Sequence, residues 1–160
     1  MKPYADSNFL IRLYLALENS PQALALTDEL RETTATLPIL WLHRLEVTNA
    51  LQMHVFAWKT MRQTRVTLEM AAATRESFRE DCIAPSSLLR NTIIDQSAWE
   101  KQFEELCLRH TANHGFRTYD ILHVAAALVL ECDRFWSFDA KAVTLAALEG
   151  LLPEPVMSHT

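Results

Sequence analysis

Short apolar runs alternate with longer segments of helical spacing, and this alternation restricts the fold more than any other feature of the chain. The strand-like runs are KPYAD (2–6), LPILWL (37–42), CIAPSSLL (82–89), DRFWSF (133–138) and a last one near EPVMS (154–158). No hairpin signal joins them, so the strands are expected to pair in parallel through crossover helices. With no linker, repeat or low-complexity segment, the sequence predicts a single α/β domain over residues 1–160.

Helical patterns fill the segments between these runs. Ser20 is expected to cap the second helix, with Pro21 at its first position. Gly115 and Gly150 follow helical segments and are expected to end them. The expected helices cover residues 7–17, 20–34, 43–58, 59–80, 95–113, 117–130 and 140–149.

Composition excludes several classes of protein. With two glycines in the chain, neither a P-loop nor a G-x-G-x-x-G turn can form, which argues against nucleotide chemistry of those kinds. The chain has 160 residues, 49% of them hydrophobic, and a net charge of −5, as expected for a globular protein with a sizeable core. No secretory signal occurs, and no apolar run reaches the ~18 residues of a membrane span. Together with three widely spaced cysteines, this predicts a cytoplasmic protein without a membrane partner.

Asp120 opens the most apolar helical segment of the chain, ILHVAAALVL (121–130). A carboxylate near a helix N-terminus can accept hydrogen bonds from free backbone N–H groups, and the helix dipole favours it by roughly 0.3–1 kcal/mol. Capping by Thr118 or Asp120 is therefore one interpretation. The other is a functional site.

Three further acids are also expected at the end of a strand or in the first turn of a helix. Asp6 ends the first expected strand, Glu46 lies in the first turn expected after LPILWL, and Asp139 follows the strand in DRFWSF. In a parallel α/β sheet, the carboxyl ends of the strands and the N-termini of the following helices share one edge. The sequence therefore predicts that Asp6, Glu46, Asp120 and Asp139 gather there.

Gathered carboxylates repel one another unless a cation neutralises them. Removing one charge, as in Asp120→Asn, is accordingly expected to stabilise the metal-free protein. Hard oxygen ligands suit Mg²⁺ or Mn²⁺, which bind through a few carboxylates, water and a substrate phosphate. The chemistry that follows is metal-assisted hydrolysis of a phosphodiester.

Four segments resemble the acidic motifs of PIN-domain ribonucleases, especially the VapC toxins. They are YADSNFLIRLYL, HRLEVTNAL, RTYDILHVAAAL and FWSFDAKAVTLAALEGL, and their order and spacing match across nearly the whole chain. The resemblance implies a three-layer α/β/α fold with a central parallel sheet of four to five strands. No motif matches between Lys59 and Arg90.

The resemblance also implies a function. It indicates an endoribonuclease dependent on Mg²⁺ or Mn²⁺, usually dimeric and held inactive by a cognate antitoxin. Apolar side chains of the first helix, Phe9, Leu13 and Leu17, favour a dimer contact. Carried over by position, Asp6, Glu46, Asp120 and Asp139 would be the catalytic set, in which Asp6, Asp120 and Asp139 hold the metal, and Asn8 and Ser137 would contact RNA.

Other polar residues have simpler interpretations. His123 is expected to pack in the core with its ring nitrogens satisfied. His110 and His114 have metal spacing but lack the glutamate of H-E-x-x-H, which argues against zinc. Arg117 is expected to contact RNA or pair with an acid. The arginines at positions 62, 65, 75 and 79 form a solvated helical face or a basic lip for RNA.

Two other functional classes stay open. A phospho-accepting signalling domain also places an aspartate at a strand end, but the paired acids expected near its first strand are missing here. A catalytically silent PIN-fold binding module would keep the fold without turnover, although the four acids argue against it.

Overall fold

The computed structural model describes residues 1–85 and 87–155, and the chain divides into two compact units. The first unit combines Met1–Asp6 with the chain from Ile93 onward, and the second is Ser7–Thr92. None of the described helices is long and apolar enough to cross a membrane.

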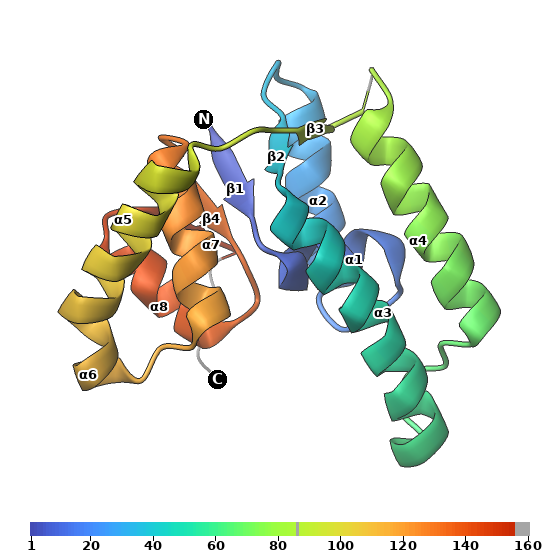
Figure 1. Cartoon of the computed structure of the whole chain (residues 1–160). Helices are drawn as coiled ribbons and strands as arrows, with labels where there is room; N and C mark the ends of the chain where they lie inside the picture. Colours follow the sequence, from blue (N-terminus) through green and yellow to red (C-terminus); the bar gives the residue numbers. More distant parts are fainter. Residues whose placement is uncertain (86, 156–160) are drawn as a thin grey trace. The chain divides into compact units, whose positions relative to one another are not determined.

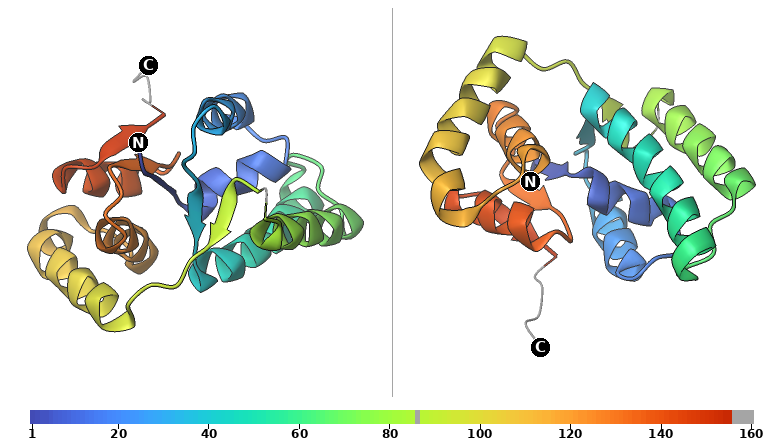
Figure 2. Two further views of the ribbon diagram at one scale, coloured as in Figure 1. Left: turned by 90° about the horizontal axis from the view of Figure 1, so that it is seen from above. Right: turned by 60° about the horizontal axis from the view of Figure 1, so that its bottom comes forward.

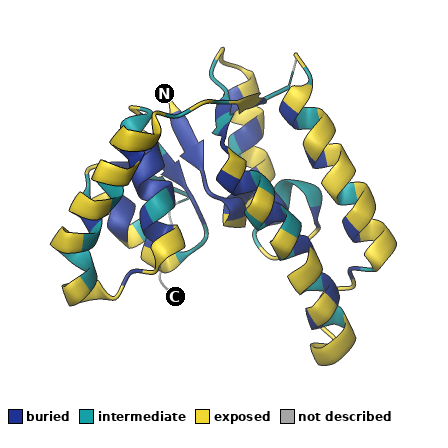
Figure 3. Cartoon of the chain, viewed as in Figure 1, coloured by how far each residue is buried: buried dark blue, intermediate teal, exposed yellow. Residues whose placement is uncertain are grey.

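A parallel three-stranded sheet forms the centre of the first unit. Its strands are β1 (Pro3–Ala5), β4 (Arg134–Trp136) and β5 (Leu152–Glu154), in the order β1-β4-β5. Figure 1 labels the first two. Ala5 lies opposite Trp136, so the carboxyl ends of β1 and β4 are level with each other. All three residues of β1 are buried, as are Phe135 and Trp136 of β4 (Figure 3).

The helices of this unit are α5 (Gln96–Leu106), the π-helical segment η1 (Cys107–Thr111), α6 (Ala112–His114), α7 (Thr118–Val129) and α8 (Ala140–Leu148). Helix α7 packs against both α5 and α8, which explains its nearly uniform apolar sequence. Val124, Ala125, Ala126 and Ala127 are completely buried. The small alanine side chains on α7 allow the neighbouring helices to approach closely.

The second unit contains two parallel strands and four helices in its described residues. Strands β2 (Leu37–Ile39) and β3 (Leu89–Asn91) pair, with Leu37 opposite Leu89. Helix α1 (Ser7–Tyr14) packs against α2 (Ser20–Arg31) and α3 (Trp41–Met61), and α3 packs against α4 (Leu68–Ile83) (Figure 2). The Tyr14 hydroxyl donates to Asp81 Oδ2 at 2.6 Å, which ties α1 to α4.

The α/β class and the parallel pairing are confirmed. The described residues contain five strands, within the predicted number, but these form one sheet in each unit, of three and two strands. The last strand begins at Leu152, earlier than predicted, and residues 156–158 of the predicted strand lie outside the described chain. A single domain over the whole chain stays a prediction.

Helix boundaries differ from expectation in several places. The largest difference is that α3 continues to Met61 and α4 begins only at Leu68, where the sequence predicted a helix from residue 59. Asn19, with φ of 67°, precedes α2, and Ser20 is its first residue; the Ser20 hydroxyl donates to Leu15 O. Helix α3 begins at Trp41, so the strand in LPILWL is limited to three residues. Gly115 (φ 64°) and Gly150 (φ 82°) adopt the left-handed conformation just after helices, as predicted for helix ends.

Candidate functional site

Asp6 and Ser137 follow neighbouring parallel strands and are therefore brought side by side. The Asp6 N–H donates to Trp136 O at 3.1 Å, which extends the pairing of β1 and β4 by one residue. The Ser137 hydroxyl then donates to Asp6 Oδ2 at 2.5 Å. Both residues are buried, and Ser137 is completely so. The register of two strands thus fixes the first acid of the site.

Asp139 is tied to the same turn. Its backbone N–H donates to the Ser137 hydroxyl oxygen at 2.9 Å, so that hydroxyl accepts from Asp139 while donating to Asp6. Asp139 also caps α8, because its Oδ1 accepts from the N–H of Lys141 at 2.9 Å and of Ala142 at 3.4 Å. Its second oxygen, Oδ2, does not take part in this cap and accepts from a side chain instead.

Asp120 lies in the first turn of α7, three residues after the N-cap residue Arg117. Its Oδ2 accepts from the Arg117 backbone N–H at 3.1 Å, and its side chain is only 8% exposed. The capping interpretation is therefore confirmed. Capping uses one carboxylate oxygen, so it leaves Oδ1 for a second role.

Arg117 joins two of the acids. Its Nε donates to Asp120 Oδ2 at 3.1 Å, and its NH2 group donates to Asp120 Oδ1 at 3.2 Å and to Asp139 Oδ2 at 2.6 Å. Hydrogen bonds to Asp120 and then to Asp139, with the attraction of both charges, raise the pKa of the Arg117 guanidinium above its usual value. The expected pairing of Arg117 with an acid is confirmed, but its second partner was not predicted.

A buried hydrogen bond connects strand β1, which precedes Asp6, to helix α7, which contains Asp120. It joins the Tyr4 hydroxyl and His123 Nδ1, which lie 2.9 Å apart. Tyr4 stands two residues before Asp6, and His123 stands three residues after Asp120. Tyr4 also stacks on Phe135 of β4, with ring centroids 5.8 Å apart. His123 is 4% exposed and packs in the core, as predicted.

Glu46 and Asn8 belong to the second unit. Because α3 begins at Trp41, Glu46 lies in the second turn of that helix, whereas the sequence suggested the first. Its Oε2 accepts from the Ser7 hydroxyl at 2.8 Å, and Ser7 directly follows Asp6 in the chain. The exposed Asn8 accepts from Arg12 NH1 through Oδ1 at 2.8 Å. The role of Ser7 was missed, because a serine beside an acid is not distinctive in a sequence.

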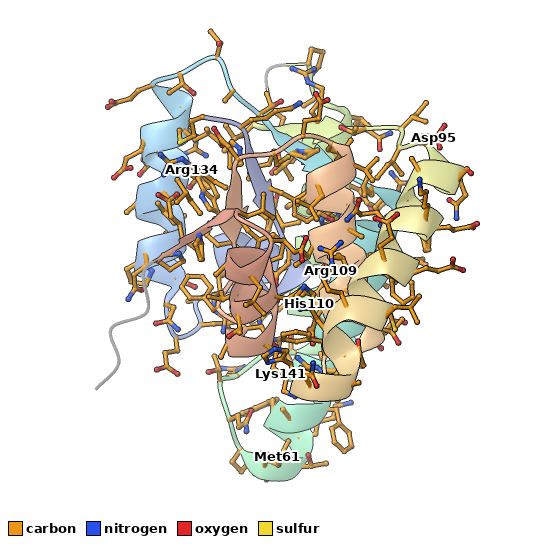
Figure 4. The ribbon with its side chains drawn as sticks, turned by 90° about the vertical axis from the view of Figure 1, so that its left-hand side faces the viewer. Met61, Asp95, Arg109, His110, Arg134 and Lys141 are labelled. Atoms are coloured by element: carbon orange, nitrogen blue, oxygen red, sulfur yellow. The ribbon has the colours of Figure 1, made fainter. Side chains whose placement is uncertain are left out.

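His110 and His114, which have metal spacing in the sequence, each contact a neighbouring side chain. His110 Nε2 lies 2.5 Å from Glu149 Oε1, and Arg109 NH1 donates to both oxygens of Glu149. Arg109 and His110, both labelled in Figure 4, thus tie η1 to the C-cap residue of α8. His114 stacks on Phe116. The arginines of the second unit's possible basic lip are all exposed, at positions 62, 65, 75 and 79.

The donor chemistry of the acidic cluster fits a divalent cation. Asp6, Asp120 and Asp139 supply hard carboxylate oxygens, and the Arg117 guanidinium already stands as a positive charge between two of them. Among the described residues, however, no group of three or more His, Cys, Asp or Glu side chains has the arrangement of a metal site. The five residues Asp6, Arg117, Asp120, Ser137 and Asp139 thus form one hydrogen-bonded cluster with a guanidinium as its cation.

Comparison with solved structures identifies the fold. VapC20 of Mycobacterium tuberculosis, a sarcin-ricin loop cleaving toxin, superposes with a TM-score of 0.63 over 94% of this chain and 97% of its own, at 16% identity. VapBC2 of Rickettsia felis, bound to a promoter DNA fragment, gives 0.63 over 96% and 98%, at 13% identity. The chain has a PIN-like α/β fold.

FitAcB of Neisseria gonorrhoeae shares this PIN-like fold, with a TM-score of 0.57, 13% identity, and coverage of 94% of this chain and 95% of its own. No protein-family model and no curated protein matches the sequence. At these identities the likeness establishes the fold, and the predicted α/β architecture is confirmed.

Proposed function

We propose that this chain is a metal-dependent endoribonuclease toxin of the VapC type. The observation that carries the proposal is the hydrogen-bonded cluster of Asp6, Ser137, Asp139, Arg117 and Asp120 at the carboxyl ends of β1 and β4. It lies within a chain that has the fold of VapC toxins. In parallel α/β sheets this edge is where ligands bind.

Each acid has a defined part in the proposed reaction. Asp6, Asp120 and Asp139 would hold Mg²⁺ or Mn²⁺, and Glu46 would complete the catalytic set. When bound, such an ion lowers the pKa of a water molecule and stabilises the leaving oxygen of the cleaved phosphodiester. The Ser137 hydroxyl orients Asp6 through its 2.5 Å hydrogen bond, and the α8 N–H groups orient Asp139. Asn8 and Arg117 are proposed to contact the RNA, whereas Ser137, for which RNA contact was also expected, is completely buried and is proposed to position Asp6 and Asp139 instead.

RNA cleavage by matched variants tests this proposal. Asp120→Asn keeps the shape of the side chain and removes its charge, and it should abolish cleavage of total RNA in Mg²⁺ or Mn²⁺. Asp133→Asn makes the same change at the opposite end of β4, where Asp133 accepts from the Lys2 N–H, and it should cut at the wild-type rate. EDTA should stop cleavage by both active proteins. If wild type cuts no RNA with either metal, the silent binding module becomes the better interpretation.

The proposed partners are a cognate antitoxin and a second copy of the chain. The fold supports the antitoxin, since VapBC2 and FitAcB come from toxin–antitoxin systems. Of the apolar side chains expected to form a dimer contact on the first helix, Phe9 is completely buried, Leu13 and Leu17 are half-buried, and Leu17 lies beyond the end of α1. Helix α3 instead exposes Leu45, Met53 and Phe56, at 62%, 53% and 53%, on one side of the helix. A cytoplasmic location stays a prediction.

A further inference from the structure

The Arg117 guanidinium binds one oxygen of Asp120 and one of Asp139 that do not accept from a backbone N–H of a helix cap. Asp120 Oδ2 caps α7 and Asp139 Oδ1 caps α8 through backbone N–H groups. The remaining oxygens, Asp120 Oδ1 and Asp139 Oδ2, both accept from Arg117 NH2, at 3.2 and 2.6 Å. These are the oxygens that could turn to another cation without breaking either helix cap.

The carboxylates are held firmly, whereas the guanidinium is not. The Asp120 side chain is 8% exposed and that of Asp139 is 27% exposed, but the Arg117 side chain is 62% exposed. Moving Arg117 into solvent therefore uncovers little apolar surface. Its backbone N–H can remain on Asp120 Oδ2 because that bond does not depend on where the side chain lies.

A guanidinium and a divalent ion on the same pair of oxygens repel each other strongly. An ion bound at the ~2.1 Å typical of Mg²⁺ would lie within van der Waals range of NH2. Two positive charges at that distance repel each other, and because the Asp120 side chain that both would contact is only 8% exposed, solvent screens this repulsion incompletely. Occupancy by one cation accordingly disfavours occupancy by the other.

We propose that Arg117 is an exchangeable counter-ion, which neutralises Asp120 and Asp139 in the metal-free protein and leaves them when a divalent ion binds. The guanidinium that is released then faces solvent beside the site and is available to a phosphate of the RNA. This inference rests on the proposed function. It also identifies the residue that limits metal affinity, since each bound ion must replace an existing pair of hydrogen bonds.

Metal titration of matched arginine variants tests the exchange. Arg117→Ala should bind Mn²⁺ roughly tenfold more tightly than wild type in calorimetric titrations of the full chain. Arg109→Ala is the control, because it removes one positive charge and an ion pair with Glu149 in the same unit but away from the cluster. It should bind Mn²⁺ within about twofold of wild type.

The position of the Arg117 side chain can be followed directly by NMR. Its Nε–H signal is assigned by its loss in Arg117→Ala, and saturation with diamagnetic Mg²⁺ should move it to the position of a free, solvated guanidinium. Equal Mn²⁺ affinity in all three proteins, or an unmoved Arg117 signal with Mg²⁺ bound, would overturn the exchange and leave the nuclease proposal intact. No Mn²⁺ binding by any of them would overturn both.

Discussion

At Asp120, ion pairing reverses the effect expected of removing a charge. Repulsion among the carboxylates would make Asp120→Asn more stable than wild type in EDTA, but Asp120 is paired with Arg117 through two guanidinium nitrogens. We therefore expect the variant to be less stable by about 0.5–1.5 kcal/mol, a modest loss because Arg117 is largely exposed. Urea unfolding in EDTA measures the difference.

A double-mutant cycle with Arg117→Ala separates the pair from other effects. The two substitutions should be less destabilising together than the sum of their separate effects, with a coupling of roughly 0.5–1 kcal/mol. If Asp120→Asn is more stable than wild type and shows no coupling to Arg117, repulsion among the carboxylates outweighs the ion pair.

The link between η1 and α8 is expected to weaken in acid. Burial raises the pKa of Glu149, but hydrogen bonds from His110 and Arg109 and their attraction outweigh it, so the pKa of Glu149 lies below its usual value of 4.5. A lowered carboxyl pKa stabilises the folded state above the unfolded pKa, and this contribution disappears as the pH falls through the folded value.

Glu149→Gln should therefore be less stable than wild type at pH 7 by about 1 kcal/mol, and the difference should shrink below about pH 4.5. Thermal melts across pH 3–7 check this, with Glu105→Gln, an exposed acid of α5, as the control. A difference that grows in acid would mean that the Glu149 pKa is raised.

Helix α3 is the element proposed to contact a second copy of the chain. Leu45, Met53 and Phe56 lie exposed on one side of it, and burying them against an equivalent surface would remove apolar area from water. Phe56→Glu should convert a dimer into a monomer in light scattering at micromolar concentration. Ile83→Glu, at a 78% exposed position of α4, should stay dimeric. A dimeric Phe56→Glu would exclude this face.

Sequence reasoning succeeded where a local pattern determines an element. The apolar run of α7, the glycines after α6 and α8, and the acids after β1 and β4 could all be located from their spacing. Sequence-based prediction failed where contacts between distant parts of the chain determine the local structure. The π-helical turn at Cys107–Thr111 has no local signal, and the start of α3 depends on where the three-residue strand β2 stops pairing. The bridge from Arg117 to Asp139 joins residues 22 apart, so no local pattern reveals it.

For the whole molecule, we predict one cooperative unfolding transition. The first unit is built from two separate pieces of chain, and β1 has its neighbour β4 more than a hundred residues away in sequence. A single domain should unfold with equal calorimetric and van't Hoff enthalpies, of roughly 110 kcal/mol for this length. Two resolved transitions in scanning calorimetry would show instead that the two units are separate domains.

The pairing of β1 with β4 also determines when the acidic cluster can form during translation. Asp6 is made 131 residues before its neighbour Ser137, and Asp139 is added two residues later still. A nascent chain therefore carries Asp6 without these two neighbours over that whole interval of synthesis. If the cluster cleaves RNA, the ribosome that makes the protein meets no assembled cluster until Ser137 and Asp139 have been added.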